Sequence, residues 1–386
     1  MNSRRNLCSG LMTSTLLIGC AVASNPQARA AGHLAGLSHV PAQDANTQTY
    51  LTDIRRIRSS ERVTVNTSKF KKSGPYVVGY IAQGPINGWG KEFDVAMRYE
   101  LQKSHQVKKL IYINSGGDVS KEITGVEDLI GQHPDVIIMT PLGKAALAAP
   151  VQRAVAAGIP VVVSGGTVST DRVTSEVGRN LPQTAYQSAT RLAQLLHGKG
   201  NVVMFDGIAG SDSAEGWKAA AHAAFDKFPR IKVVAEQYAN WSVATATTQM
   251  QAILSAHPSI DGVWSGGSEM SIGAINGFAD AHKPMPVFGT TNPLNGFLRL
   301  ARQHHLKFYA SPYPPSAMSK VAADTALKIL HGQPVKKYID VINVVSQAGG
   351  YSQVKLGARY RSDLNDDFVP PAIIPVAALK KAGFAR

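Results

Sequence analysis

The chain has 386 residues, of which 44% are hydrophobic and 17% charged, which is the composition of a globular protein. A chain of this length is too long for a single core of average size. Its formal charge of +14 accompanies no helix-turn-helix, zinc-finger or RNA-binding pattern, so we interpret it as a solvated basic surface and expect no nucleic-acid partner. Both cysteines, Cys8 and Cys20, lie near the N-terminus, which excludes disulfides, a Cys-ligated metal and a cysteine nucleophile in the folded part.

Residues 1–30 have the pattern of an export signal. An Arg-Arg pair precedes an uncharged apolar run, residues 11–23, that is shorter than a transmembrane helix. The pair fits a twin-arginine signal and an ordinary Sec signal equally well, so the export route stays open. Residues 28–30 fit a cleavage site, whereas Cys20 ends a sequence like a lipobox; we favour soluble cleavage over acylation. The sequence thus predicts a periplasmic protein.

Residues 31–72 form a polar leader. Within it, Thr47–Ser60 is compatible with a short helix. We expect this segment to pack on the outside of the first domain or to be partly disordered.

From Pro75 onward, short apolar runs alternate with helical segments. This rhythm predicts parallel strands that are buried on both faces and joined by right-handed crossovers, which makes a doubly wound sheet. The expected strands are 76–82, 109–113, 135–139 and 160–163, and the expected helices are 92–103, 119–132 and 145–157.

The pattern then restarts, with too many strands for one compact sheet, so two similar α/β lobes are predicted. The expected strands are 201–205, 232–235, 262–264, 286–289 and 307–310, and the helices are 184–197, 218–228, 243–256, 269–281, 294–303 and 315–330. We assign 75–179 plus about 312–340 to the N-terminal lobe, 180–311 plus about 341–350 to the C-terminal lobe, and 351–386 to a tail packing on the lobes.

Residues 207–217 (GIAGSDSAEGW) connect a predicted strand to a predicted helix through glycines. Such turns lie at the carboxyl ends of strands, where open α/β sheets bind ligands. Glu215 either completes a capping box with Asp212 or contacts the ligand, while we assign Trp217 to packing within the lobe. Glu269 lies in a first helical turn, where the helix dipole alone favours a carboxylate.

Four segments together resemble the ribose-type periplasmic substrate-binding proteins of ABC importers. The segments are GIAGS at 207–211, SEMSIGA at 268–274, AAGIPVV at 156–162 and LKILHG at 327–332, and the resemblance runs from about residue 75 to about 345. It implies two doubly wound lobes, joined by a hinge of three crossings, that close around a sugar. LacI-type repressors have similar lobes, but they carry a DNA-binding headpiece where this chain has an export-signal pattern.

The family's ligand residues transfer only in part. Gly165-Gly166 stands where the family has an Asp-Arg pair, Glu215 where it has an Arg, and Gly267-Ser268 where it has Asn-Asp. Thr291 or Asn292 replaces an Asp, and Ser311 replaces a Gln. The resulting candidate ligand-binding set is Asn87, Trp89, Thr140, Gly165, Arg179, Asp212, Glu215, Trp241, Ser268, Glu269, Thr291, Asn292, Ser311 and Tyr313.

These substitutions remove the Asp and Arg side chains that each bond two sugar hydroxyls, whereas aromatic residues remain. Trp89 and Trp241 follow strands, which favours a place in the cleft over a place in the core. We therefore expect a wider and more apolar pocket than a ribose site. Arg179 either faces the ligand or forms an interlobe ion pair.

No sequence pattern of a catalytic nucleophile, a zinc protease or a phosphate-binding loop occurs, so we expect no enzyme and no cofactor. His304-His305 is interpreted as a surface pair rather than a metal site. The predicted function is an exported, monomeric solute-binding protein that captures a sugar, polyol or less polar ring compound and delivers it to a membrane ABC permease. The alternative is a periplasmic sensor that docks on a receptor kinase.

Overall fold

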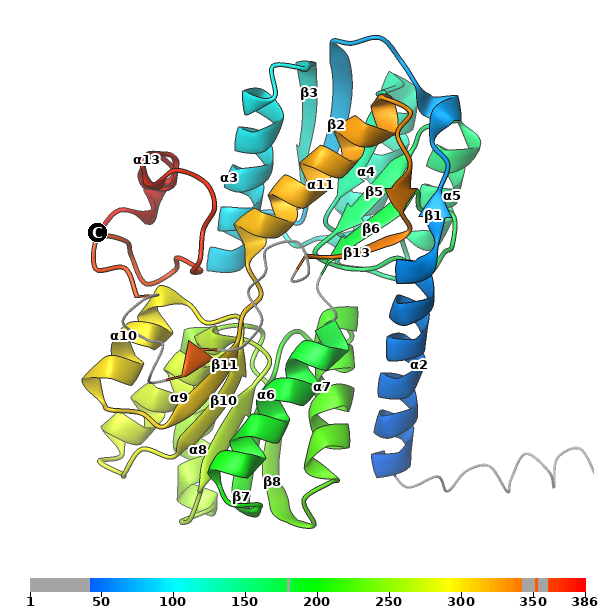
Figure 1. Cartoon of the computed structure of the whole chain (residues 1–386). Helices are drawn as coiled ribbons and strands as arrows, with labels where there is room; N and C mark the ends of the chain where they lie inside the picture. The colour runs from blue at the N-terminus through cyan, green and yellow to red at the C-terminus, as the bar shows by residue number, and fades with distance from the viewer. Residues whose placement is uncertain (1–41, 179–180, 342–350, 353–359) are drawn as a thin grey trace, which may run out of the picture. The chain divides into compact units, whose positions relative to one another are not determined.

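The computed structural model describes residues 42–178, 181–341, 351–352 and 360–386 (Figure 1). The predicted export signal with Cys20, the hinge residues Arg179 and Asn180, and most of the segment 341–350 lie outside the described residues.

The first sheet has six parallel strands in the order β13-β6-β5-β4-β2-β3. Alternate side chains of its strands face two separate cores: Ile138 and Val162 pack toward α3 and α11, whereas Ile137 and Val163 pack toward α4 and α5. The bounds are β2 Tyr76–Ala82, α3 Gly88–Lys103, β3 Val107–Asn114, α4 Val119–Gln132, β4 Val136–Met139, α5 Ala148–Ala156, β5 Val161–Ser164, β6 Ser175–Gly178, α11 Pro315–Leu330 and β13 Tyr338–Asp340.

The second sheet has the order β14-β11-β10-β9-β7-β8, parallel except for β14. Here Met204 packs toward α6 and α7, and Phe205 packs toward α8, α9 and α10. The bounds are α6 Leu181–Leu195, β7 Lys199–Asp206, α7 Asp212–Phe225, β8 Arg230–Tyr238, α8 Val243–Ala256, β9 Gly262–Ser265, α9 Ser268–Asp280, β10 Val287–Thr291, α10 Asn295–Gln303, β11 Phe308–Ser311 and β14 Tyr351–Ser352.

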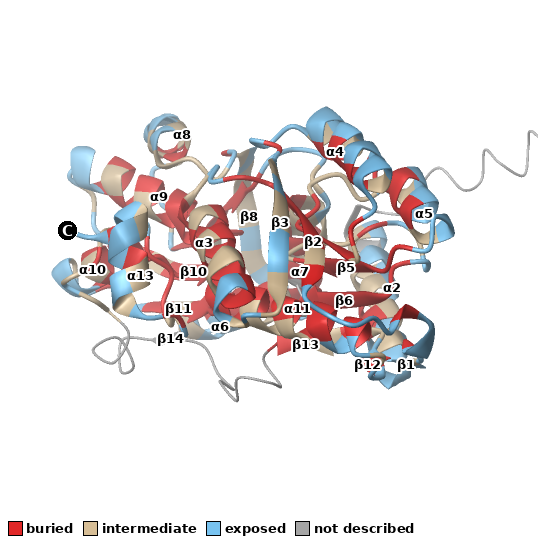
Figure 2. Ribbon diagram, turned by 90° about the horizontal axis from the view of Figure 1, so that it is seen from above, coloured by how far each residue is buried: buried red, intermediate tan, exposed pale blue. Residues whose placement is uncertain are grey.

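The predicted class, two doubly wound parallel-sheet lobes, is therefore confirmed. The chain passes between the sheets three times: from β6 to α6, from β11 to α11, and from β13 to β14. The inner strands β5, β6 and β10 appear red, and thus buried, in Figure 2, whereas the edge strands β3 and β8 are tan and pale blue. Sequence reasoning missed β6, whose SEVG sequence is polar although its residues are buried, and it missed the short pair β1 (Thr64–Val65) and β12 (Val335–Lys336).

The leader contains a longer helix than expected, α2, which spans Ala42–Arg62. It contacts α7 and α6 of the second lobe as well as β13 of the first. Tyr50 stacks on Tyr186 of α6 with ring centroids 4.9 Å apart, and Arg56 pairs with Glu176 of β6 at 3.0 Å. The segment therefore packs on the first lobe, as expected, and it also packs on the second lobe, which the sequence did not indicate.

The C-terminal segment 360–386 also contacts both lobes. Phe368 and Phe384 belong to a small core that includes Ala96 of α3. Val369 donates its backbone N–H to Glu92 of α3, while the carbonyl of Phe368 accepts from the N–H of Asn295 in α10. The segment ends in a short helix, α13 (Val376–Leu379), and a π-helical turn, η4 (Lys380–Phe384). Among the described helices, none has the length and apolar character needed to cross a membrane.

Candidate functional site

A cavity lies between the two lobes at the carboxyl ends of their strands, with about 640 Å³ of empty space including its opening to solvent. Both lobes contribute to its lining. Eight predicted residues line it: Asn87, Trp89, Gly165, Asp212, Trp241, Glu269, Asn292 and Tyr313. This is the position that open α/β sheets give to ligands.

Trp89 and Gly165 form the N-terminal wall of the cavity together. A Cβ atom on Gly165 would lie 2.7 Å from the Trp89 ring and 3.0 Å from Thr140, and Gly165 has φ +79°. Only glycine leaves room for the indole in this backbone conformation. The resemblance implies an acidic residue at this position; with Gly165 in its place, the Trp89 ring occupies the adjacent space.

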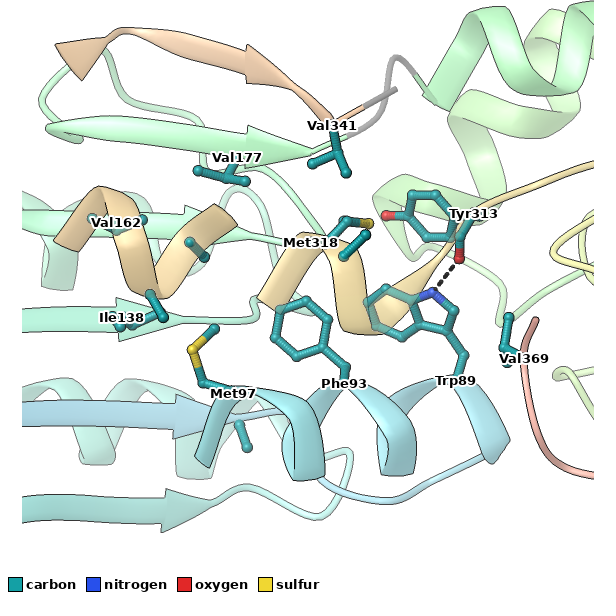
Figure 3. Close-up of a cluster of buried hydrophobic side chains, with 14 of the residues drawn as sticks. Trp89, Phe93, Met97, Ile138, Val162, Val177, Tyr313, Met318, Val341 and Val369 are labelled. Atoms are coloured by element: carbon teal, nitrogen blue, oxygen red, sulfur yellow. Dashed lines mark hydrogen bonds between the residues drawn. The ribbon is translucent and has the colours of Figure 1, made fainter. Parts of the chain in front are cut away.

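The Trp89 indole is held by three contacts within the protein. Its Nε1–H donates to the carbonyl of Tyr313 at 2.9 Å (Figure 3). The ring stacks on Tyr313 at 5.2 Å and on Phe93 at 5.1 Å between centroids. Tyr313 in turn donates its hydroxyl to the carbonyl of Gly165 at 3.2 Å. Because Tyr313 follows β11 at a crossing between the lobes, this cluster connects the cavity wall to the crossing.

Asn87 lines the cavity, but its side chain has a structural role. Its Oδ1 accepts the backbone N–H of Gly90 at 2.8 Å and so caps the start of α3. Sequence reasoning placed the start of this helix at Glu92, four residues too late, and therefore did not find the cap.

Two tryptophans form the C-terminal wall. Trp241 donates its Nε1–H to the carbonyl of Gly266 at 2.8 Å, and it adopts φ +50°, which is strained for a bulky residue. Its ring packs so closely on Gly207 that a Cβ there would lie 2.3 Å away. The glycines of the strand-end turns thus make space for the indole.

Trp217 lines the cavity as well as packing in the lobe, so the interpretation as lobe packing alone was incomplete. Its ring stands at 79° to Trp241 and at 84° to Tyr313. The missed signal is the helix start: α7 begins at Asp212, not at Lys218, which places Trp217 in its second turn.

Glu269 is buried, with 5% of its surface exposed, and among the described residues no other residue hydrogen-bonds to either carboxylate oxygen. Burial raises the pKa of Glu269 to about 7; its own backbone N–H opposes this shift, and the carboxylate of Asp367 adds to it. A Cβ on Gly267 would lie 2.8 Å from Trp241 and 3.1 Å from Oε2 of Glu269, so ring and carboxylate meet beside this glycine. Because Glu269 lies in the first turn of α9, the helix dipole stabilises its carboxylate. No described side chain pairs with it.

The predicted capping box of Asp212 and Glu215 is wrong, because Asp212 is already the first residue of the helix and its side chain accepts from Lys144 instead. Ser211 is the N-cap of α7, and Glu215 accepts the N–H of Gly210 at 3.0 Å and the hydroxyl of Tyr238 at 2.7 Å. Glu215 does not line the cavity. Asp212 does, and its Oδ2 accepts the backbone N–H of Lys144 in the other lobe at 2.7 Å.

Four further candidates lie behind the cavity lining. Thr140 follows β4, and Thr291 and Ser311 are the last residues of β10 and β11; all three are buried. Among the described residues, the hydroxyl groups of Thr291 and Ser311 have no hydrogen-bond partner. Ser268 donates to the carbonyl of Asn292 and accepts the N–H of Leu294, so it fixes the start of α9 against the loop after β10. Arg179 lies outside the described residues.

Apart from Trp217, the remaining lining residues were not among the predicted ligand contacts. Most lie in strand-end loops, and Ser213 lies in the first turn of α7: Gln83, Ile86, Pro141, Leu142, Gly166, Thr167, Ser211, Ser213, Gly266 and Gly267. Their backbone positions follow from strand order, which places these loops side by side. Among the described residues, no cluster of three His, Cys, Asp or Glu side chains has the arrangement of a metal site.

Comparisons with known proteins agree with this architecture. The sequence model of the family described as periplasmic binding protein domain matches residues 78–334 of this chain. The ribose import binding protein of Bacillus subtilis (strain 168) is 27% identical over 250 residues, which cover 64% of this chain and 80% of the relative. The xylitol-binding protein of Mycolicibacterium smegmatis is 29% identical over 47% of this chain and 52% of its own length.

Solved structures show the same fold. An ABC transporter solute-binding protein from Bacillus halodurans C-125 with bound myo-inositol has a TM-score of 0.68 and is 19% identical, over 74% of this chain and 98% of its own.

Proposed function

Because the chain belongs to the periplasmic binding protein family, we propose that it is an exported solute-binding protein that captures a small ligand between its lobes and delivers it to a membrane ABC permease. The observation that carries this proposal is the cavity at the strand ends of both sheets, lined by aromatic and polar side chains from each lobe. A ligand in this position contacts both lobes at once.

Capture by lobe closure follows from that placement. A ligand that binds both lobes favours the conformation in which they are close, and the closed surface is what a permease distinguishes from the empty protein. The Asp212 to Lys144 hydrogen bond across the cavity mouth joins the lobes directly, and α2 and the C-terminal segment contact both. These contacts add to the stability that the ligand gives the closed form.

The ligand classes we propose are sugars, polyols and related ring compounds, because the two relatives above are named for ribose and xylitol and a structural neighbour holds myo-inositol. Import proteins among these relatives favour transport over sensing. We further propose that the protein acts as a periplasmic monomer without nucleic-acid partner or catalytic activity.

Thermal-shift screening of the purified protein against sugars, polyols and amino derivatives tests ligand capture. A ligand that binds only the folded state raises the melting temperature, so we expect at least one compound to do so in a concentration-dependent manner. The matched variant Trp241→Ala removes a wall of the cavity and should abolish the shift. Co-purification of the ligand-bound protein with a receptor kinase, and with no permease, would reject transport.

A further inference from the structure

The most unusual group in the cavity is the carboxylate of Glu269. Buried carboxylates in folded proteins are paired or hydrogen-bonded, because an isolated buried charge is costly. Among the described residues, no other residue forms an ion pair or a hydrogen bond with the Glu269 carboxylate, which has only its own backbone N–H nearby. An unsatisfied acid at a ligand cavity therefore indicates that the ligand supplies the partner.

The sign of the charges around Glu269 supports this reasoning. The chain as a whole has 40 Lys and Arg against 26 Asp and Glu. Yet the described residues that line the cavity include two acids, Asp212 and Glu269, and no Lys, Arg or His. Asp367, from the C-terminal segment, adds a further negative charge near Glu269. The part of the cavity lining that the structure describes is thus acidic, which favours a cation over an anionic ligand.

The aromatic rings point to the same kind of ligand. Trp217 stands nearly perpendicular to both Trp241 and Tyr313, at 79° and 84°, so the three rings form walls rather than a stack. The carboxylate of Glu269 lies beside one of these rings, at Gly267. Aromatic walls with an adjacent carboxylate are the chemistry that recognises an ammonium group, through cation–π attraction and an ion pair.

Two more unsatisfied groups define the rest of the ligand. Within the described part of the chain, the buried Nε1–H of Trp217 has no acceptor and the buried Oδ1 of Asn292 has no donor. A hydroxyl group accepts from the first or donates to the second. The ligand therefore carries hydroxyl groups as well as the positive charge.

Resting on the proposed function, we infer that the cavity binds an amino sugar or amino polyol, whose protonated amino group pairs with Glu269 between the aromatic walls while its hydroxyl groups bond to Trp217 and Asn292. A neutral polyol of the same shape can donate a hydroxyl to Glu269, but it leaves the negative charge uncompensated. The structure thus distinguishes two ligands that differ by one charged group.

Isothermal titration with matched pairs tests the inference. The pairs are glucosamine with glucose, glucamine with sorbitol, and an inosamine with the corresponding inositol; N-acetylglucosamine retains the nitrogen without its charge. We expect at least one amine to bind at least about 10-fold more tightly than its neutral partner at neutral pH. Glu269→Gln should weaken binding of that amine by about 100-fold or more and leave the neutral partner within a few-fold, because the variant keeps the shape and loses the charge.

Glu215→Gln is the matched control, since Glu215 lies in the same lobe outside the cavity, and it should leave amine binding unchanged. Equal or tighter binding of the neutral partners, or unchanged amine binding in Glu269→Gln, overturns the inference and leaves ligand capture standing. Failure of every amine while another compound in the screen raises the melting temperature has the same consequence. If no compound binds at all, the inference and the proposed function both fail.

Discussion

In the N-terminal lobe, Asn87 and Trp89 line the cavity and are already bonded within the protein: Asn87 caps α3, and the Trp89 N–H donates to Tyr313. In the C-terminal lobe, three lining residues carry buried polar atoms without a partner, namely Trp217, Glu269 and Asn292. The two walls face the same space, but among the described residues only the C-terminal wall has buried polar atoms that are not bonded within the protein.

The difference separates stability from recognition. A satisfied wall adds to the stability of the folded state whether or not ligand is present. Unsatisfied buried groups cost stability until a ligand provides their partners, which is the usual cost of a binding site. We therefore expect substitutions in the N-terminal wall to act mainly on stability, and those in the C-terminal wall to act mainly on binding.

The largest stability effect is expected at Gly165. Gly165→Ala introduces a methyl group 2.7 Å from the Trp89 ring at a φ of +79°. Backbone strain and overpacking together should lower the free energy of unfolding by about 2 to 5 kcal/mol. Gly210→Ala is the matched control, since its φ of +75° is similar and no atom lies within 4 Å of the new methyl group. Its loss should be about 1 to 2 kcal/mol in urea unfolding. Equal losses in the two variants would mean that Trp89 moves freely and that the N-terminal wall is not preformed.

The second effect is a change in the pH dependence of stability at Glu269. The folded-state pKa, about 7, exceeds the ordinary value of 4.5, so the folded protein holds this proton more tightly than the unfolded chain does. Below pH 4.5 both states are protonated and burial of the charge costs nothing. The cost then grows with pH and is complete above about pH 7, where it is on the order of 3 kcal/mol.

Glu269→Gln removes this titration. The stability of the variant relative to the natural protein should therefore increase from pH 4.5 to pH 7.5, as measured by chemical unfolding across that range without ligand. Parallel stability curves for the two proteins would show that the charge is already compensated in the empty cavity, and the contrast between the walls would then be lost.

The sequence predicted the two sheets well because their strands are short apolar runs with little ambiguity. Residues 136–139 and 161–164 are buried throughout, as continuous apolar runs between helices indicate. It failed where local composition and burial disagree. β6 has a polar sequence, yet Ser175 is buried and bonded to the carbonyl of Lys336, a residue 161 positions away.

The site was predictable at strand ends and not beyond them. Trp241 was found because it follows a strand, whereas Asn87 and Glu269 were found through the resemblance to the ribose-type binding proteins. The orientation of side chains depends on helix starts, and an error of six residues at α7 hid the role of Trp217. The lack of partners at Glu269 is a property of the surrounding structure, because every distant residue that could have paired with it had to be placed first.

The smallest expected effect gives the most direct comparison of the two walls, because it makes the same substitution in each. Trp89→Phe removes an N–H that donates to the buried carbonyl of Tyr313, so stability should fall by about 1 to 3 kcal/mol through the lost hydrogen bond and the unsatisfied oxygen. Trp217→Phe removes an N–H that has no acceptor among the described residues, so only the smaller buried ring destabilises this variant. Its loss of stability should therefore be smaller than that of Trp89→Phe.

Binding should show the reverse order, with ligand affinity falling about 10-fold in Trp217→Phe and less in Trp89→Phe, since one hydrogen bond to a ligand hydroxyl is worth about 1.4 kcal/mol. Urea unfolding without ligand and titration calorimetry with the tightest ligand measure the two quantities on the same proteins. If Trp217→Phe loses as much stability as Trp89→Phe and keeps its affinity, the unpaired N–H belongs to the lobe core and the C-terminal wall is not the recognising one.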